Sequence, residues 1–109
     1  MKVILSSLLF LASVASALVL DTPSGWKSGQ EVTEHWQIQR GDPAAFNLEL
    51  RSSNNQNNNW DVANNVRTAN DEVTFRLPKV PAGRYVLRAV NTNNNNQVYA
   101  ESSQFNIAQ

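Results

Sequence analysis

The feature that most constrains this chain is a two-residue alternation of apolar and polar side chains, which recurs along its length while no window keeps a helical period. Phe46, Leu48 and Leu50, for example, alternate with polar residues. Because successive side chains of a strand point to opposite faces, this pattern predicts strands with one buried face. The segments that we expect to form strands are residues 18–21, 32–38, 46–51, 60–66, 73–77, 85–90 and 97–107.

Turn residues separate these segments. Proline and glycine occur in residues 22–25, 41–43 and 78–83, where proline fixes φ and glycine supplies positive φ. Two asparagine tracts, residues 54–59 and 93–96, also lie between expected strands and are predicted to be hairpin loops. About seven short strands with this spacing predict an all-β fold, an immunoglobulin/fibronectin-III-like two-sheet antiparallel sandwich.

Individual strands carry more specific expectations. Val32, Trp36 and Ile38 share an apolar face on which Glu34 is the polar exception, so we expect Trp36 in the core. Residues 85–90 are apolar enough on both faces to form a central strand. Tyr85 is a candidate corner tyrosine, whose hydroxyl would bond back to the backbone upstream.

Residues 1–17 have the three-part pattern of a secretory signal peptide. A basic start at Lys2 precedes the apolar run 3–14, and Ala15 and Ala17 supply the small residues that signal peptidase reads. The run is too short to cross a hydrocarbon core of ~30 Å as a permanent helix. We therefore expect cleavage after Ala17, a single domain over residues 18–109, and a secreted, extracellular or cell-wall-associated product without a membrane anchor.

Composition excludes several classes of function. The 109 residues contain no cysteine, which excludes disulfides, thiolate metal sites and cysteine nucleophiles, and one histidine, which excludes sites that need two imidazoles. The formal net charge is zero, so no basic surface for nucleic acid is indicated. No cofactor or metal is expected, and carboxylate pairs such as Asp71 and Glu72 would point to opposite faces of a strand. We therefore expect that the protein is not an enzyme.

Aromatic residues near turns are candidate ligand contacts. Trp26 follows a Pro-Ser-Gly turn, Trp60 follows the first asparagine tract, and Tyr99 lies in the last expected strand. An exposed ring can stack on the apolar face of a sugar, with neighbouring amides bonding the hydroxyl groups. The alternative is that these rings cap the open end of the sandwich.

The asparagine tract itself is the second candidate. Asn57, Asn58 and Asn59 each offer two donors and one acceptor to a polysaccharide. A solvated spacer loop is the plainer interpretation, and pairing of asparagine-rich edges in assemblies is a third.

Several runs of residues together resemble a fungal cell-wall domain. These runs are Leu20-Asp21-Thr22-Pro23, Phe46-Asn47-Leu48-Glu49-Leu50, Val73-Thr74-Phe75-Arg76-Leu77-Pro78, Pro81-Ala82-Gly83-Arg84-Tyr85-Val86-Leu87-Arg88 and Ser102-Ser103-Gln104-Phe105-Asn106-Ile107. The chain resembles the N-terminal domain of the fungal β-1,6-glucan-synthesis proteins, which is shared with the Ser/Thr-rich GPI-anchored fungal membrane proteins. The similarity spans residues 18–109.

The resemblance implies a non-catalytic secreted protein associated with the fungal cell wall or extracellular matrix, with wall β-glucan as the candidate ligand. The Ser/Thr-rich stalk with a GPI signal and the C-terminal region of the glucan-synthesis members have no counterpart in this chain. The alternative hypothesis is an effector-like or self-assembling module whose partner is a secreted or host protein.

Overall fold

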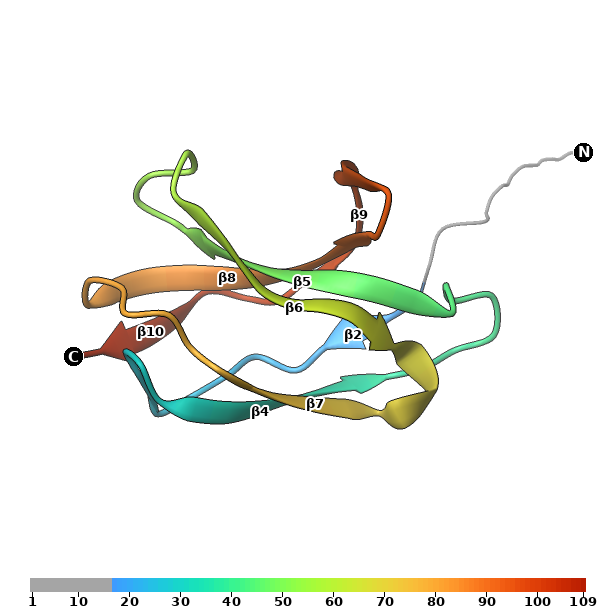
Figure 1. Ribbon diagram of the computed structural model, residues 1–109, viewed down its shortest axis with the longest axis horizontal. Coiled ribbons are helices and arrows are strands. Elements are labelled where there is room, and N and C mark those ends of the chain that lie inside the picture. The colour runs from blue at the N-terminus through green and yellow to red at the C-terminus, as the bar shows by residue number, and fades with distance from the viewer. Residues whose placement is uncertain (1–16) are drawn as a thin grey trace, which may run out of the picture.

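The computed structural model describes residues 17–109, and the predicted signal peptide lies outside the described residues except for Ala17. Two β-sheets face each other with the core between them (Figure 1). The larger sheet has the order β3 (Trp26–Lys27), β10 (Phe105–Ala108), β8 (Gly83–Asn91), β5 (Ala45–Ser52) and β6 (Asn59–Arg67), and β9 (Asn94–Glu101) also pairs with β8. The smaller sheet has the order β2 (Val19–Leu20), β4 (Glu31–Gln37) and β7 (Glu72–Arg76). The predicted immunoglobulin-like sandwich is confirmed, with β8 in a central position.

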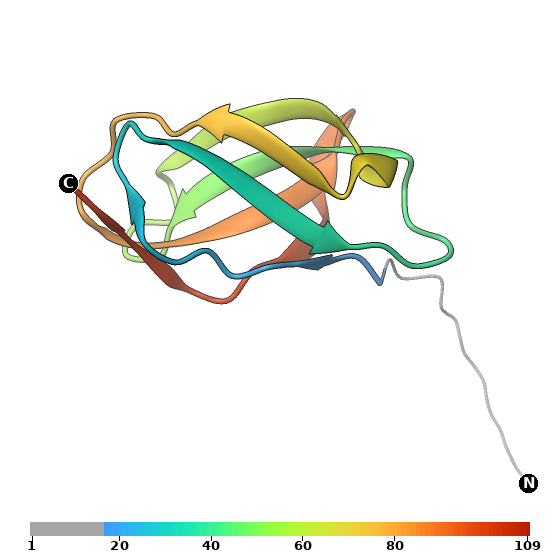
Figure 2. The ribbon, with the colours of Figure 1, turned by 90° about the horizontal axis from the view of Figure 1, so that it is seen from below.

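The described residues form nine strands where seven were expected, and the first difference lies at the N-terminal end. After β2 has paired with β4, the chain crosses to the other sheet, where β3 pairs with β10 in parallel (Figure 2). Gly25 permits the crossing with a φ of 75°. All other pairings are antiparallel. A strand of two residues is too short for an alternation to reveal it.

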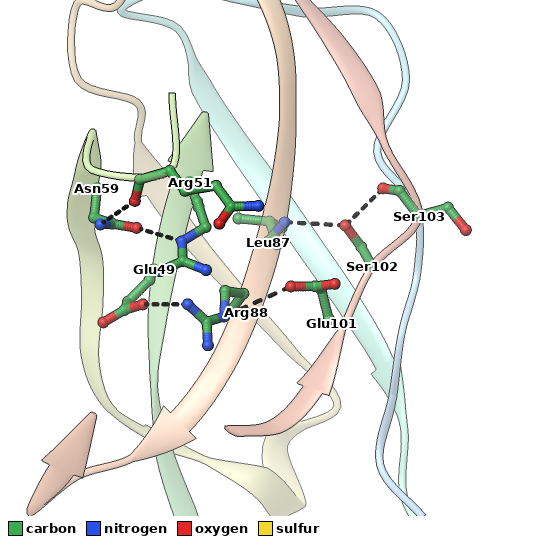
Figure 3. Close-up of polar contacts among 9 residues, drawn as sticks. Glu49, Arg51, Asn59, Leu87, Arg88, Glu101, Ser102 and Ser103 are labelled. Carbon is green, nitrogen blue, oxygen red and sulfur yellow. Dashed lines mark hydrogen bonds and ion pairs between the residues drawn. The ribbon is translucent and has the colours of Figure 1, made fainter. Parts of the chain in front are cut away.

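The second difference is a break in the last expected strand. β9 and β10 lie along the same edge of β8, and residues 102–104 separate them. At the break, the backbone N–H of Leu87 donates to Ser102 Oγ at 3.0 Å (Figure 3), while the N–H of Ser102 donates to the Leu87 carbonyl at 2.9 Å. The serine hydroxyl thus replaces a backbone carbonyl, and the edge continues past an irregularity that alternation alone does not predict.

The core fills the space between the sheets. Trp36 is 4 % exposed, its ring packs edge-on against Phe46 at 5.1 Å between centroids, and its Nε1–H donates to the Thr68 carbonyl at 2.8 Å. The expected core position of Trp36 is confirmed. The largest fully buried apolar side chains of this core are Phe46, Leu48, Leu50, Leu77, Leu87 and Ile107.

Glu34 is the polar exception on this inner side. The residue is 2 % exposed, and its Oε2 is buried without a hydrogen-bond partner. Burial, with a smaller contribution from the nearby Asp21 carboxylate, raises the pKa of Glu34 to about 8. The carboxyl group is therefore protonated in the folded protein at neutral pH.

Two local expectations were wrong and one was confirmed. Ile38 is 41 % exposed because β4 ends at Gln37, so Ile38 does not continue the buried face. The tract 93–96 is not a loop throughout, since β9 begins at Asn94. The Tyr85 hydroxyl donates to the Pro81 carbonyl at 2.6 Å, which confirms the corner tyrosine, and burial raises the pKa of Tyr85.

Candidate functional site

One side of the larger sheet faces away from β4 and β7, and we call it the outer face. It carries many polar side chains, although its strands β5 and β8 are the central strands of the sheet. In the β5–β8 register, Asn47 lies opposite Val90, Glu49 opposite Arg88, and Arg51 opposite Val86. The residues between them, such as Leu48 and Leu50, point into the core. The outer face thus has a floor of alternating charged, amide and valine side chains, namely Asn47, Glu49, Arg51, Val86, Arg88 and Val90.

Two asparagine-rich hairpins rise above this floor. The first hairpin, residues 53–59, leads from β5 into β6, and the second hairpin, residues 91–96, leads from β8 into β9. Figure 1 shows both on the same side of the sheet, one near each end of its strands. The topology therefore places the two tracts, which are far apart in the sequence, around one surface.

Arg88 lies at the centre of the floor between two carboxylates. Its Nη1 is 3.8 Å from Glu49 Oε1 and its Nε is 3.6 Å from Glu101 Oε2 (Figure 3). The side chains of Arg88 and Glu49 are only 13 % and 8 % exposed, and the buried Arg88 Nε has no hydrogen-bond partner. Both contacts are longer than a hydrogen bond, so the two carboxylates balance the charge of the guanidinium group without satisfying its buried Nε–H donor.

A second arginine ties the first hairpin to the floor. Arg51 Nε donates to Asn59 Oδ1 at 3.0 Å, and Asn59 Nδ2 donates to the Gln56 carbonyl at 3.1 Å. Asn59 is thus a structural link between β5 and the hairpin. Its amide is already occupied at both ends.

The remaining asparagines divide into two groups. Asn55, Asn91 and Asn94 each accept, through Oδ1, the backbone N–H two residues further on, at 2.7–3.1 Å. These side chains shape the turns. Among the described residues, no hydrogen bond involves the side-chain amides of the second group, which comprises Asn54, Asn57, Asn58, Asn93, Asn95 and Asn96.

Hollows lie beneath both hairpins. The first hollow, about 120 Å³, lies where Gln56 of the first hairpin faces Arg51, Val86 and Glu101. The second hollow, about 310 Å³, is enclosed by Asn47, Glu49 and Val90 of the floor, Asp61 of β6, and Asn93 and Asn95 of the second hairpin. Both are lined mainly by polar atoms, as is suitable for a ligand rich in hydroxyl groups.

The predicted aromatic contacts lie elsewhere. Trp26 is 8 % exposed in the core, where its ring packs edge-on against Phe75 and Phe105. Trp60 lies opposite Leu50, so it belongs to the inner side, and its half-buried ring packs against Tyr85 at 6.0 Å. Tyr99 is half-buried against the same core. None of the three rings lies on the floor of the outer face.

Of the predicted site residues, only Asn57, Asn58 and Asn59 are exposed, and all three belong to the first hairpin. The sequence reasoning missed Glu49, Arg51 and Arg88, which hold the centre of the outer face. Their polar positions in two alternating strands carried the signal. Only the register between β5 and β8 brings these polar side chains next to one another on one face of the sheet, and neither segment alone contains that information.

The outer face carries side chains of both charges. Within residues 17–109, no three or more His, Asp or Glu side chains are grouped to hold a metal ion. His35 is at the other sheet, where its Nε2 pairs with Glu72 Oε1 at 3.1 Å. The described residues also contain no helix with the length and hydropathy of a membrane span.

Comparison with protein families gives one match. The model of the Kre9/KNH-like N-terminal Ig-like domain matches residues 22–107, which is most of the chain. Kre9 is a fungal β-1,6-glucan synthesis protein. No curated protein and no solved structure matches the chain.

Proposed function

The chain belongs to the family of Kre9/KNH-like N-terminal Ig-like domains, and from this premise we propose that it is a secreted, non-catalytic protein that binds wall β-glucan on its outer face. The family relates the chain to glucan synthesis in the fungal cell wall. Secretion and glucan binding go beyond the family.

The observation that carries the proposal is the placing of both asparagine hairpins over one charged floor. Planar amides and guanidinium groups are suitable partners for sugar hydroxyl groups, because each offers donors or acceptors in fixed directions. The hairpin that carries Asn57 and Asn58 stands near one end of the strands of the floor, and the hairpin that carries Asn93 and Asn95 stands near the other end (Figure 1). Solubility alone does not require the side-chain amides of both hairpins to lie on the same face of the sheet.

Secretion is supported by the sequence of residues 1–17, and the structure from Leu18 onward is compatible with removal of that segment. Residues 1–17 have the signal pattern described above, and the side chain of Leu18, the first residue after the expected cleavage, is buried at 4 % exposure. A cut after Ala17 therefore leaves the core residues in place.

Retention on insoluble polysaccharide tests the proposal. The secreted protein is incubated with β-glucan, with chitin and with cellulose, and the bound fraction is measured after washing. We expect retention on β-glucan, and a large loss for the double variant Asn57→Ala/Asn58→Ala. Asn70→Ala is the matched control, because Asn70 is an exposed asparagine in the turn that leads to the smaller sheet.

Absence of retention on all three polysaccharides would refute glucan binding and favour the alternative of a protein partner. Equal loss of retention for Asn70→Ala and the hairpin variant would place binding away from the outer face. Melting curves of every variant ensure that a loss of retention is read only from folded protein.

A further inference from the structure

The spacing of the two hollows carries information on the size of the ligand. Val86 lies in the first hollow and Val90 in the second, and both belong to β8. Four residues of a strand cover about 13 Å, so the hollows are separated by more than the width of one sugar ring. A third hollow, about 260 Å³, continues the row at Arg84, Gln104 and Asn106, and shares Gln104 with the first.

The charges on the floor restrict the ligand's chemistry. Three carboxylates, those of Glu49, Asp61 and Glu101, line the two hollows together with the guanidinium group of Arg51. Arg88 lies between the hollows and pairs with Glu49 and Glu101. Glu49 and Asp61 lie directly opposite each other in the β5–β6 register. This arrangement offers no excess of positive charge, so it disfavours an acidic polysaccharide and is compatible with an uncharged one.

From these observations, and resting on the proposed function, we infer that the outer face is a two-part site for the interior of an uncharged, extended glucan chain, which contacts both asparagine hairpins at once across Arg88. A pocket for a small ligand usually has at least about 300 Å³ and encloses the ligand. The first hollow, about 120 Å³, is well below that volume, and the second, about 310 Å³, only just reaches it, so a single sugar in one hollow would make few contacts. Occupying both with one chain makes the second contact intramolecular, which raises the affinity without new kinds of contact.

The central cluster supports the same conclusion. Arg88 is held at 3.6–3.8 Å from two carboxylates without a hydrogen bond through its buried Nε. A hydroxyl group above the floor can accept from the guanidinium and donate to Glu49 or Glu101 at the same time. Val86 and Val90 flank the cluster on β8 but are only 9 % and 1 % exposed, so the polar side chains supply most of the contacts with the ligand.

The test is calorimetric titration of the folded protein with β-gluco-oligosaccharides of increasing length, from glucose to the hexasaccharide, in both the β-1,6 and β-1,3 series. We expect the affinity to rise with length until one oligosaccharide reaches both hollows and then to become constant. Asn57→Ala/Asn58→Ala and Asn93→Ala/Asn95→Ala should each lower the affinity for the longest ligand by roughly tenfold, the effect of about two lost hydrogen bonds. Asn70→Ala should leave the affinity unchanged.

The outcomes separate this inference from the proposed function. Binding that is independent of length, or that responds to only one hairpin, would overturn the two-part site while glucan binding stands. Equally tight binding of an oligouronate would overturn the restriction to uncharged chains. If no oligosaccharide and no insoluble glucan binds, both the inference and the proposed function fail.

Discussion

Glu34 determines how the stability of this domain depends on pH. Its pKa is raised from 4.5 to about 8 in the folded protein, so the folded state keeps a proton that the unfolded state releases above pH 4.5. The contribution of Glu34 to stability is therefore greatest below pH 4.5, falls by about 1.4 kcal/mol per pH unit between the two pKa values, and is constant above pH 8.

We predict that Glu34→Gln removes this slope. The variant's stability relative to the wild type should rise as the pH goes from 5 to 8, by roughly 2–4 kcal/mol, because the amide has no proton to lose. Urea denaturation at a series of pH values measures the difference. Glu31→Gln, on the exposed side of the same strand, is the control and should show no such trend. A pH-independent difference for Glu34→Gln would mean that the carboxyl group is hydrated in solution.

Trp36 makes several buried interactions at once. It contributes a large buried ring, an edge-on contact with Phe46 and a buried hydrogen bond to the Thr68 carbonyl. We predict that Trp36→Ala loses about 3–5 kcal/mol, against a total of roughly 5 kcal/mol or slightly more for a domain of this size. The variant should be largely unfolded by near-ultraviolet circular dichroism at 25 °C. Trp36→Phe, which keeps most of the ring, should remain folded with a lower midpoint.

At the scale of elements, the sequence predicts a strand well where apolar and polar residues alternate over several residues. It predicts poorly where a strand is very short or is interrupted by a side-chain hydrogen bond. The faces of β4, β5 and β8 follow from Val32, Leu48 and Leu87, whose neighbours alternate with them. Neither β3 nor the break at Ser102 could be predicted, because a two-residue strand has no period and a serine hydroxyl acts there as a backbone acceptor. The candidate site on the outer face could not be predicted from the sequence either. Its residues come from different strands, and only the register brings them together.

The first hairpin gives a prediction at this scale. We expect that replacing residues 54–58 by an Asn-Gly turn leaves the protein folded, since halving a loop changes the closure free energy by only about 0.6 kcal/mol. The change removes Asn57 and Asn58 together with the backbone that lies above the first hollow, so retention on β-glucan should fall while the melting temperature stays nearly constant. An unfolded variant would show instead that the tract is required for packing. Full retention would show that it is a spacer.

At the scale of the whole molecule, both sheets share one hydrophobic core, and residues at the N-terminal strand β2 pack into it. β2 has only two residues, yet its Leu20 and the preceding Leu18 are 5 % and 4 % exposed and belong to the same buried cluster as Trp36 and Leu87. No disulfide is available to fix this edge, because the chain has no cysteine. The position of signal cleavage is thus a matter of stability as well as of secretion.

We predict that the secreted protein begins at Leu18 and that the chain cannot be shortened much further. Each of the two leucines contributes about 1.5–3 kcal/mol by burial, so a chain of residues 21–109 loses an amount comparable to the roughly 5 kcal/mol that holds such a domain together. Intact mass of the secreted protein gives the N-terminus, and urea denaturation compares residues 18–109 with residues 21–109. Val19→Ser in the longer chain is the control, because Val19 is 47 % exposed between the two leucines and its loss should change the midpoint little. Equal stability of the two chains would mean that β2 is not part of the cooperative core, and the smaller sheet would then be held by β4 and β7 alone.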